Sequence, residues 1–280
     1  MAKNLSSHKS GYGNFSHTQG KVAGGGGRTP RDRARRELSQ NFLVDRYAVD
    51  LIVKTAEPAG LVLEPGPGEG VLTRALAERG ARVTAYEIDP LLAGKLSAWT
   101  RGNAGIRLVR GDFTKAKAPR EPFAVVGNIP FSVTAGIVDW CLNAPTLTSA
   151  TLLTQLEYAR KRTGDYGRWS LVTVASWLWF DWELCGRIGR ESFRPVPSVD
   201  SAILRIRRRT EPLVRDRRAF RELVELGFTG VGGSVRASLR TRYQGVDRAL
   251  AEAGIAPDTV VGYVHPDQWV SVYHSLVGDV

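Results

Sequence analysis

Apolar residues recur from about residue 44 onward at two kinds of spacing, which alternate along the first half of the chain. Short apolar runs predict strands over residues 61–63, 83–86, 106–109, 124–126 and 151–154. Apolar positions three and four residues apart predict helices over residues 44–57, 71–79, 90–100 and 134–143. A regular alternation of strands and helices is typical of a parallel sheet with helices on both faces.

The pattern changes in the second half. A helix predicted over residues 169–177 is followed by two strands, 179–186 and 201–208, with no helical pattern between them. Two such strands favour an antiparallel hairpin at the sheet edge. After residue 209 only helical spacing remains, over residues 215–228, 234–243, 245–253 and 266–277. The predicted fold is therefore an α/β, Rossmann-like, doubly wound sheet with an antiparallel edge hairpin and a small C-terminal helical domain.

Composition suggests three parts. Residues 1–36 are rich in Gly, Ser and Arg and poor in apolar residues, so we expect a disordered basic arm. Residues 37–209 are the expected α/β domain, and residues 210–280 are the expected helical domain.

Positive charge is concentrated in two segments. The 280 residues include 39 Lys and Arg against 28 Asp and Glu, a formal net charge of +11. Residues 1–40 hold a net +6 and residues 205–245 a net +7, while the stretch between is nearly neutral. This distribution favours a polyanionic partner, with nucleic acid the first candidate. The expected contacts are Arg31, Arg33, Arg35, Arg36, Arg160, Lys161, Arg162, Arg207, Arg208 and Arg209.

Several classes of protein are disfavoured. The sequence has no run of about 18 apolar residues and a polar N-terminus, so neither a membrane-spanning helix nor a secretory signal is expected. Cys141 and Cys185 are far apart, which argues against a disulfide framework and for a reducing, cytoplasmic location. The His and Cys residues lack zinc-ligand spacing. We therefore expect a cytoplasmic protein without a metal and, since no interface helix stands out, a monomer.

A glycine-rich turn follows the first expected strand, with Gly66, Gly68 and Gly70 at every second position after Glu64. In an open α/β sheet, ligands bind beyond the carboxyl ends of the strands. The spacing is GxGxG, which differs from the GxGxxG of dehydrogenases, and no P-loop sequence is present. The turn therefore predicts close approach of a ligand that is not held through phosphates.

Acidic residues close the next two expected strands. Glu87 lies 21 residues after Gly66, where a carboxylate can accept hydrogen bonds from both ribose hydroxyls. Asp112 follows the third strand, where it can accept from an adenine amine while Phe113 packs on the ring. Each alone is an ordinary surface acid, but the series outlines an adenosine-sized site.

The sequence at residues 127–131 closes the fourth strand. The side-chain carbonyl of Asn128 and the backbone carbonyl of Ile129 can accept from an exocyclic adenine amine and polarise it. Pro130 stiffens the loop, and Phe131 offers a face for a base. A helix-entry turn explains Asn-x-Pro equally well when it is taken alone.

The chain resembles the rRNA adenine-N6 methyltransferases that use S-adenosylmethionine, and within them the erythromycin-resistance (Erm) branch. The resemblance covers residues 38 to about 209. It rests on the sequences at residues 39–43, 64–70, 87–89, 111–113, 128–134, 155–164 and 193–202.

The resemblance implies a role for each matching position. Gln40 and Asn41 would border the methionine end of the cofactor, and Gly66, Gly68 and Gly70 would line its approach. Glu87 would hold the ribose, Ile88 would pack on the cofactor adenine and Asp112 would bond its amine. Asn128 and Ile129 would hold the target amine, Phe131 would stack on the target base, and Phe193 would cover its other face. Leu43, Glu64, Phe113 and Asn128 complete the expected cofactor site, and Pro130 the catalytic one.

The implied reaction is methyl transfer to an unpaired adenine of 23S rRNA, which blocks macrolide-type antibiotics and yields S-adenosylhomocysteine. Three alternatives remain open at this stage. A small-subunit rRNA dimethyltransferase shares the chemistry, a DNA adenine methyltransferase more often has Asn/Asp-Pro-Pro-Tyr/Phe, and a non-catalytic RNA-binding assembly factor would use the same fold.

Overall fold

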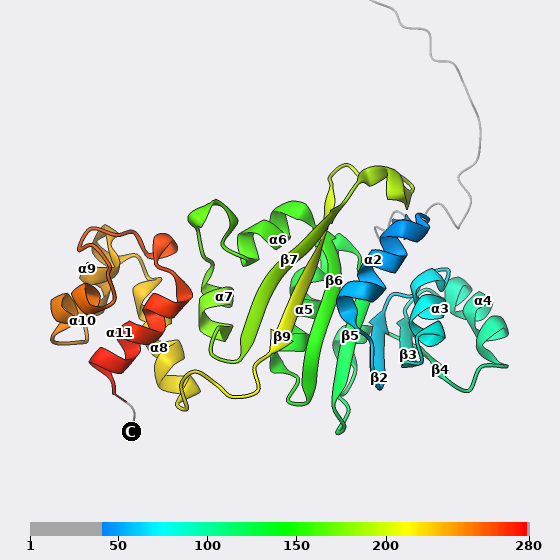
Figure 1. Cartoon of the computed structure of the whole chain (residues 1–280), viewed down its shortest axis with the longest axis horizontal. Coiled ribbons are helices and arrows are strands. Elements are labelled where there is room, and N and C mark those ends of the chain that lie inside the picture. Colours follow the sequence, from blue (N-terminus) through cyan, green and yellow to red (C-terminus); the bar gives the residue numbers. More distant parts are fainter. Residues whose placement is uncertain (1–40, 279–280) are drawn as a thin grey trace, which may run out of the picture.

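A seven-stranded sheet forms the centre of the computed structural model, which describes residues 41–278 (Figure 1). The strand order is β4-β3-β2-β5-β6-β9-β7. The strands are β2 (Leu61–Pro65), β3 (Arg82–Glu87), β4 (Ile106–Arg110), β5 (Phe123–Asn128), β6 (Leu147–Gln155), β7 (Phe180–Ile188) and β9 (Ser201–Arg208). A second, two-stranded sheet pairs β1 (Phe42–Leu43) with β8 (Phe193–Arg194).

Strand directions decide which residues share an edge. The strands β2 to β6 are parallel, and β9 runs antiparallel to both β6 and β7. The carboxyl ends of β2, β3, β4, β5, β6 and β7 therefore meet at one edge of the sheet, and the carboxyl end of β9 lies at the other. The chain order reverses beside β2, and this is where a ligand crevice is expected in such sheets.

Two apolar clusters cover the two faces of the sheet. On one face, buried residues of α5 (Thr134–Asn143) pack on β5, β6 and β9. On the other face, α2 (Arg46–Ala56) and α3 (Val71–Glu78) pack on β2 and β3. The helices α4 (Pro90–Thr100), α6 (Leu156–Arg162) and α7 (Leu171–Ser176) complete this part of the chain.

The α/β architecture and the antiparallel hairpin at the edge of the sheet are confirmed. The helices at residues 90–100 and 134–143 and the strand at 201–208 have the predicted bounds. The strand β2 continues past the predicted end at residue 63 because Glu64 is buried despite its ionisable side chain. The apolar spacing did not predict α6 or the strands β1 and β8. The helix α6 is only seven residues long and each of the two strands only two, so they are too short to show a period.

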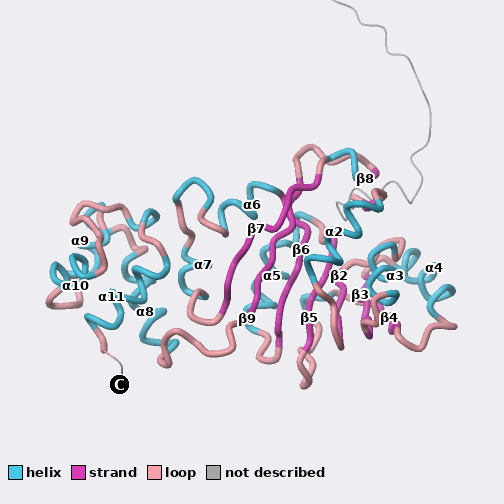
Figure 2. Tube along the Cα trace, in the orientation of Figure 1, coloured by secondary structure: helices cyan, strands magenta, loops and turns pink. Residues whose placement is uncertain are grey.

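Residues after β9 form helices and no strand within the described part of the chain. These helices are α8 (Arg217–Gly227), α9 (Val235–Arg240), α10 (Val246–Glu252) and α11 (Pro266–Leu276), and Figure 2 shows them beside the sheet. They share one apolar core with Val174 and Leu178, which come from before residue 209. The three-part domain division stays a prediction, and residues 1–36 lie outside the described residues. No helix from residue 41 to 278 is long and apolar enough to cross a bilayer.

Candidate active site

Two adjoining cavities lie beside the glycine-rich loop after β2. The Asn128 cavity is lined by residues 41–43, Glu64, 66–69, Val71, Leu72 and 128–131. The Glu87 cavity is lined by Pro65, Gly66, 86–88, 111–114, Pro130, Ser132, Val133 and Ile137. Gly66 and Pro130 line both, so the cavities share a wall at the carboxyl ends of β2 and β5.

The glycine-rich loop is closely packed on its neighbours. Gly68 has a left-handed backbone with a φ of 58°, and a Cβ placed on it would lie 2.9 Å from the Phe42 ring. Its N–H donates to Oε2 of Glu87 at 3.0 Å. Any larger residue at this position would strain the backbone and displace Phe42. The glycines of the loop thus bring main-chain atoms to the wall of the Asn128 cavity, which Pro67 and Glu69 of the same loop also line.

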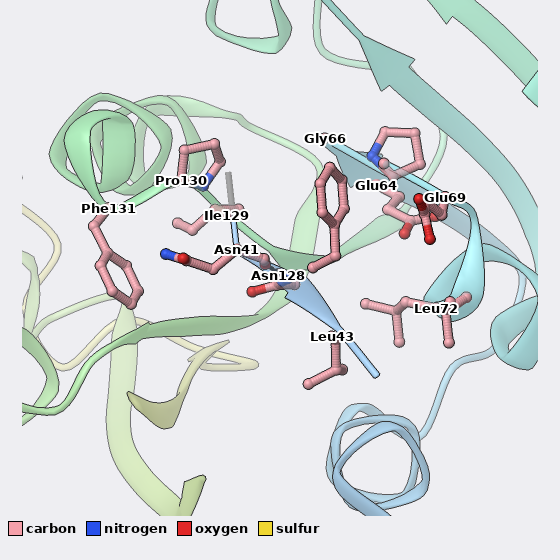
Figure 3. A pocket seen from close by; sticks show the side chains of 14 residues that line it. Asn41, Leu43, Glu64, Gly66, Glu69, Leu72, Asn128, Ile129, Pro130 and Phe131 are labelled. Atoms are coloured by element: carbon pink, nitrogen blue, oxygen red, sulfur yellow. Dashed lines mark hydrogen bonds between the residues drawn. The ribbon is translucent and has the colours of Figure 1, made fainter. Parts of the chain in front are cut away.

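The orientation of the Asn128 side chain is set by its partner. Its Nδ2 donates to the backbone carbonyl of Asn41 at 2.8 Å. A carbonyl can only accept, so the amide NH₂ must face Asn41 and Oδ1 must face away from it. In Figure 3, Asn128 lies between Phe131 and Pro130 on one side and Glu64 and Leu72 on the other. The side chain therefore keeps a fixed acceptor in the cavity that Phe131 also lines.

The small sheet of β1 and β8 holds Asn41 in place. Phe42 pairs with Arg194, the N–H of Val44 donates to the Ser192 carbonyl at 2.8 Å, and Ser192 Oγ donates to Asp45 Oδ2 at 3.0 Å. Sequence reasoning missed Phe42 as a cavity residue, although it lies inside the matching sequence at residues 39–43. Gln40 lies outside the described residues.

Glu87 is buried at the carboxyl end of β3, and both its carboxylate oxygens accept backbone hydrogen bonds. Oε2 accepts from Gly68 and Oε1 from Asp89 at 2.9 Å. Burial raises the pKa of this carboxyl, and the two backbone N–H groups oppose that rise. Each oxygen retains a lone pair. Glu87 can thus hold the glycine-rich loop and accept from a ligand at the same time.

Asp112, Ile88 and Phe113 line the Glu87 cavity. Asp112 Oδ1 accepts from the N–H of Thr114 at 2.9 Å and from its hydroxyl at 2.7 Å, which fixes the carboxylate. Ile88 is exposed and gives the cavity an apolar rim. Phe113 is 4% exposed and packs edge-to-face on Tyr86, so it belongs mainly to the core.

Glu64 is a buried acid on the wall of the Asn128 cavity, with 1% of its surface exposed. Burial, with a smaller contribution from the neighbouring Glu87 charge, raises its pKa to about 8. Its Oε2 atom has no hydrogen-bond partner among the described residues. The structure therefore favours a protonated Glu64 at neutral pH when the cavity holds no cation.

We expect Glu64→Gln to change how stability depends on pH. In the unfolded chain Glu64 releases its proton near pH 4.5, whereas the folded protein retains it until about pH 8. Between these values this group lowers the free energy of unfolding by up to about 1.4 kcal/mol per pH unit as the pH rises. Urea unfolding between pH 5 and 8 should show this slope for the wild type and a reduced slope for Glu64→Gln. Glu78→Gln, an exposed acid on α3, should follow the wild type, and parallel curves for all three proteins would contradict a raised pKa.

Phe193 is not among the residues that line either cavity. Its side chain is 1% exposed, pairs in register with Leu43 and belongs to the core beneath α2. The expectation that Phe193 covers one face of the target base does not fit this position, because its ring is already enclosed by the protein. Phe193 is buried because β8 pairs with β1. The two strands are far apart in the sequence, so the sequence pattern did not predict this pairing.

The predicted RNA contacts at Arg207, Arg208 and Arg209 lie far from the two cavities. Arg207 and Arg208 end β9 and Arg209 follows it, and the antiparallel direction of this strand places them at the edge of the sheet opposite Asn128. Arg208 donates to the backbone carbonyls of Leu147 and Ala144 at 2.7 and 2.8 Å.

Arg209 pairs with Asp181 at 2.7 Å and also donates to the Trp177 carbonyl at 3.0 Å. The guanidinium groups of Arg208 and Arg209 thus make hydrogen bonds and an ion pair within the folded chain. Arg207 is exposed, but it lies on the same far edge.

The second predicted run, Arg160, Lys161 and Arg162, lies in α6. This helix begins immediately after the carboxyl end of β6, so it shares the sheet edge of the two cavities. Lys161 is exposed, whereas Arg162 is half-buried and donates to Ser170 Oγ at 2.8 Å. Arg31, Arg33, Arg35 and Arg36 lie outside the described residues. Of the three cations in α6 only Lys161 is exposed, because Arg160 is half-buried and pairs with Asp165 at 2.8 Å and with Glu157 at 3.7 Å.

The sheet, the glycine-rich loop and the acids at successive strand ends together define a Rossmann-like methyltransferase. The family model described as ribosomal RNA adenine dimethylase matches residues 31–277. The chain belongs to this family, whose members are S-adenosylmethionine-dependent methyltransferases of rRNA adenines. No group of three or more potential metal ligands is clustered among residues 41–278.

Individual relatives cover most of the chain. An rRNA adenine N-6-methyltransferase of Saccharopolyspora erythraea is 53% identical over 89% of this chain and 67% of its own length. One from Streptomyces fradiae is 54% identical over 87% of this chain and 79% of its own length. Among solved structures, the 23S rRNA methyltransferase ErmE is 53% identical, covers 84% of this chain and 99% of its own, and has a TM-score of 0.81.

Proposed function

We propose that this chain transfers methyl groups from S-adenosylmethionine to the N6 amine of an adenine in 23S rRNA and thereby blocks macrolide-type antibiotics. ErmE, at 53% identity, is described as a 23S rRNA methyltransferase. A relative from Micromonospora griseorubida, 38% identical over 88% of this chain, is named a mycinamicin-resistance protein. The structural observation that carries the proposal is the fixed amide of Asn128 in a cavity that Phe131 also lines.

The two cavities suit S-adenosylmethionine, which supplies a methyl group already activated on a sulfonium and so needs no metal. Glu87 has acceptor capacity for ribose hydroxyls, and Asp112 has Oδ2 for an adenine amine. The unpartnered Oε2 of Glu64 suits the cationic methionine end of the cofactor. We assign the adenosine part to the Glu87 cavity and the methionine part to the Asn128 cavity.

The residues around Asn128 would act mainly by positioning. Oδ1 of Asn128 and the carbonyl of Ile129 would accept from the target amine and direct its lone pair at the methyl group. Phe131 would stack on the base, and Pro130 limits movement of the loop. Correct placement of two reactants is worth about 7–11 kcal/mol in intramolecular models. An amide has no useful basicity, so the proton would leave to solvent after transfer.

The target adenine must leave its stack to reach this site, which costs a few kcal/mol in a duplex and less in a loop. We therefore propose an unpaired or loop adenine as substrate. We further propose that the protein acts as a monomer, that residues 37–209 carry out the transfer, and that residues 210–280 and the basic arm contribute to RNA binding.

Mapping of N6-methylated adenines across both rRNAs, with and without the protein expressed, tests the function. A new mark at the macrolide-binding region of 23S rRNA, together with macrolide resistance, is the expected result. A mark near the 3′ end of the small-subunit rRNA would instead indicate the ribosome-maturation enzyme. No mark despite abundant folded protein would favour a non-catalytic assembly factor.

Removal of residues 1–36 should weaken RNA binding in a salt-dependent way. The segment carries eight Lys and Arg against one Asp, so it can contact several phosphates. Each phosphate contact steepens the dependence of the logarithm of the binding constant on the logarithm of the salt concentration by about 0.7 on single strands. Fluorescence anisotropy between 50 and 300 mM salt should show a shallower slope and weaker low-salt binding for the truncated protein. A full-length variant with Arg31, Arg33, Arg35 and Arg36 changed to Gln should behave similarly. Unchanged affinity at low salt would contradict a role for the arm.

A further inference from the structure

Tyr166 adopts an unusual backbone conformation in the loop between α6 and α7. Its φ of 71° and ψ of 13° are left-handed, and Gly164 and Gly167 on either side are left-handed too. A residue with a side chain pays a steric cost in this region. Core packing does not offset this steric cost, because Tyr166 is 62% exposed. Strained backbone conformations are concentrated at functional sites, so this exposed aromatic ring is a candidate binding residue.

Arg160 supports one face of this ring. Its guanidinium carbon lies 4.9 Å from the ring centroid, and its Nη1 donates to the Tyr166 hydroxyl. The arginine is itself held by Asp165, whose Oδ2 lies 2.8 Å from Nε. One face of the ring therefore rests on a fixed cation, while the high exposure of the side chain leaves the remaining ring surface to solvent.

The loop lies on the edge of the sheet that bears Asn128. It follows α6, which starts where β6 ends, and Figure 1 shows α6 and this loop at the same end of the sheet as the start of α2. A second arginine–tyrosine pair lies beside it. Arg168 donates to the Tyr263 hydroxyl at 2.9 Å and lies 4.9 Å from the Tyr263 ring centroid. Exposed Lys161 adds positive charge to the same edge.

We propose that Tyr166, supported by Arg160, is a stacking platform for one unpaired base of the RNA strand that carries the target adenine. This subsite is separate from the cavity of the target base, and the inference rests on the proposed function. Proteins that bind single strands stack bases on aromatic rings beside cations, and every base offers a suitable face. The platform would thus select for an unpaired neighbouring nucleotide without reading its identity.

Three substitutions separate stacking from a structural role. Tyr166→Ala should raise the KM for RNA and weaken RNA binding about tenfold or more, while the KM for S-adenosylmethionine stays unchanged. Tyr166→Phe keeps the ring and should remain within about threefold of the wild type. Tyr166→Gly should lose RNA affinity as Tyr166→Ala does, yet raise the thermal midpoint, because glycine accepts the left-handed backbone.

The RNA probe is a synthetic 23S rRNA fragment with the mapped target adenine, in which single nucleotides near it are replaced by abasic residues. One abasic position should weaken binding of the wild type about tenfold and have no further effect on Tyr166→Ala. Trp99→Ala is the matched control, because it removes an exposed arginine–aromatic pair at the end of α4, on the opposite edge of the sheet.

Equal RNA affinity of Tyr166→Ala and wild type would overturn the platform. So would a loss of RNA affinity in Tyr166→Ala that Trp99→Ala shares, or one accompanied by a matching loss of cofactor affinity. None of these outcomes bears on the proposed function, which fails only if the wild type leaves no methyl mark on 23S rRNA.

Discussion

Asn128→Ala is expected to lower kcat for methyl transfer about 100- to 1,000-fold while the Kd for S-adenosylmethionine changes little. Loss of one preorganised polar group at a reacting centre has effects of this size. The acceptor Oδ1 disappears, and the Asn41 carbonyl loses the donor that is now 2.8 Å away. Single-turnover assays with radiolabelled cofactor measure the rate, and calorimetry measures cofactor affinity in the same preparation.

Asn128→Asp provides the sharper comparison, since it preserves size and supplies two acceptors. A carboxylate cannot donate to the Asn41 carbonyl, so the side chain should turn and most activity should be lost. Asn143→Ala is the control, because Asn143 also donates to a backbone carbonyl, that of Asp139 at 2.9 Å, but at the exposed end of α5. Parallel loss of cofactor binding and transfer in Asn128→Ala would instead place Asn128 in the cofactor site.

Glu87→Ala is expected to weaken S-adenosylmethionine binding about 100-fold or more. Hydrogen bonds to a charged group contribute about 1.5–3 kcal/mol each, and two ribose hydroxyls would lose their acceptor. The N–H groups of Gly68 and Asp89 would also lose their partner, which loosens the glycine-rich loop. Calorimetric titration with S-adenosylhomocysteine measures the Kd without turnover.

Glu87→Gln should fall between the wild type and Glu87→Ala, because its amide keeps one oxygen but presents NH₂ to a backbone donor. Glu121→Ala removes an exposed acid paired with Arg82 and should leave the Kd unchanged. Thermal unfolding of each variant distinguishes a local defect from general instability. Wild-type cofactor affinity in a folded Glu87→Ala protein would remove Glu87 from the proposed ribose site.

Much of the fold could be predicted from the sequence, and the reason is visible in particular elements. The apolar spacing of α5 and the alternation in β9 depend on residues a few positions apart, so their bounds matched the prediction. Glu64 shows the limit of this reasoning. The predicted strand stopped at residue 63, whereas the folded chain buries Glu64 with a raised pKa and continues β2 to Pro65.

The sequence by itself determined the α/β alternation, the edge hairpin and the order of candidate residues at strand ends, because each is encoded by neighbours along the chain. Only the tertiary structure decided where the arginines of β9 and the ring of Phe193 lie. Those positions follow from pairing between distant strands, β6 with β9 and β1 with β8. The first pairing places the charged end of β9 at the far edge of the sheet. The second buries the Phe193 ring, which the local sequence alone would allow to be exposed. It also places Asn41 against Asn128, a contact across 87 positions that orients the amide on which the proposed chemistry depends.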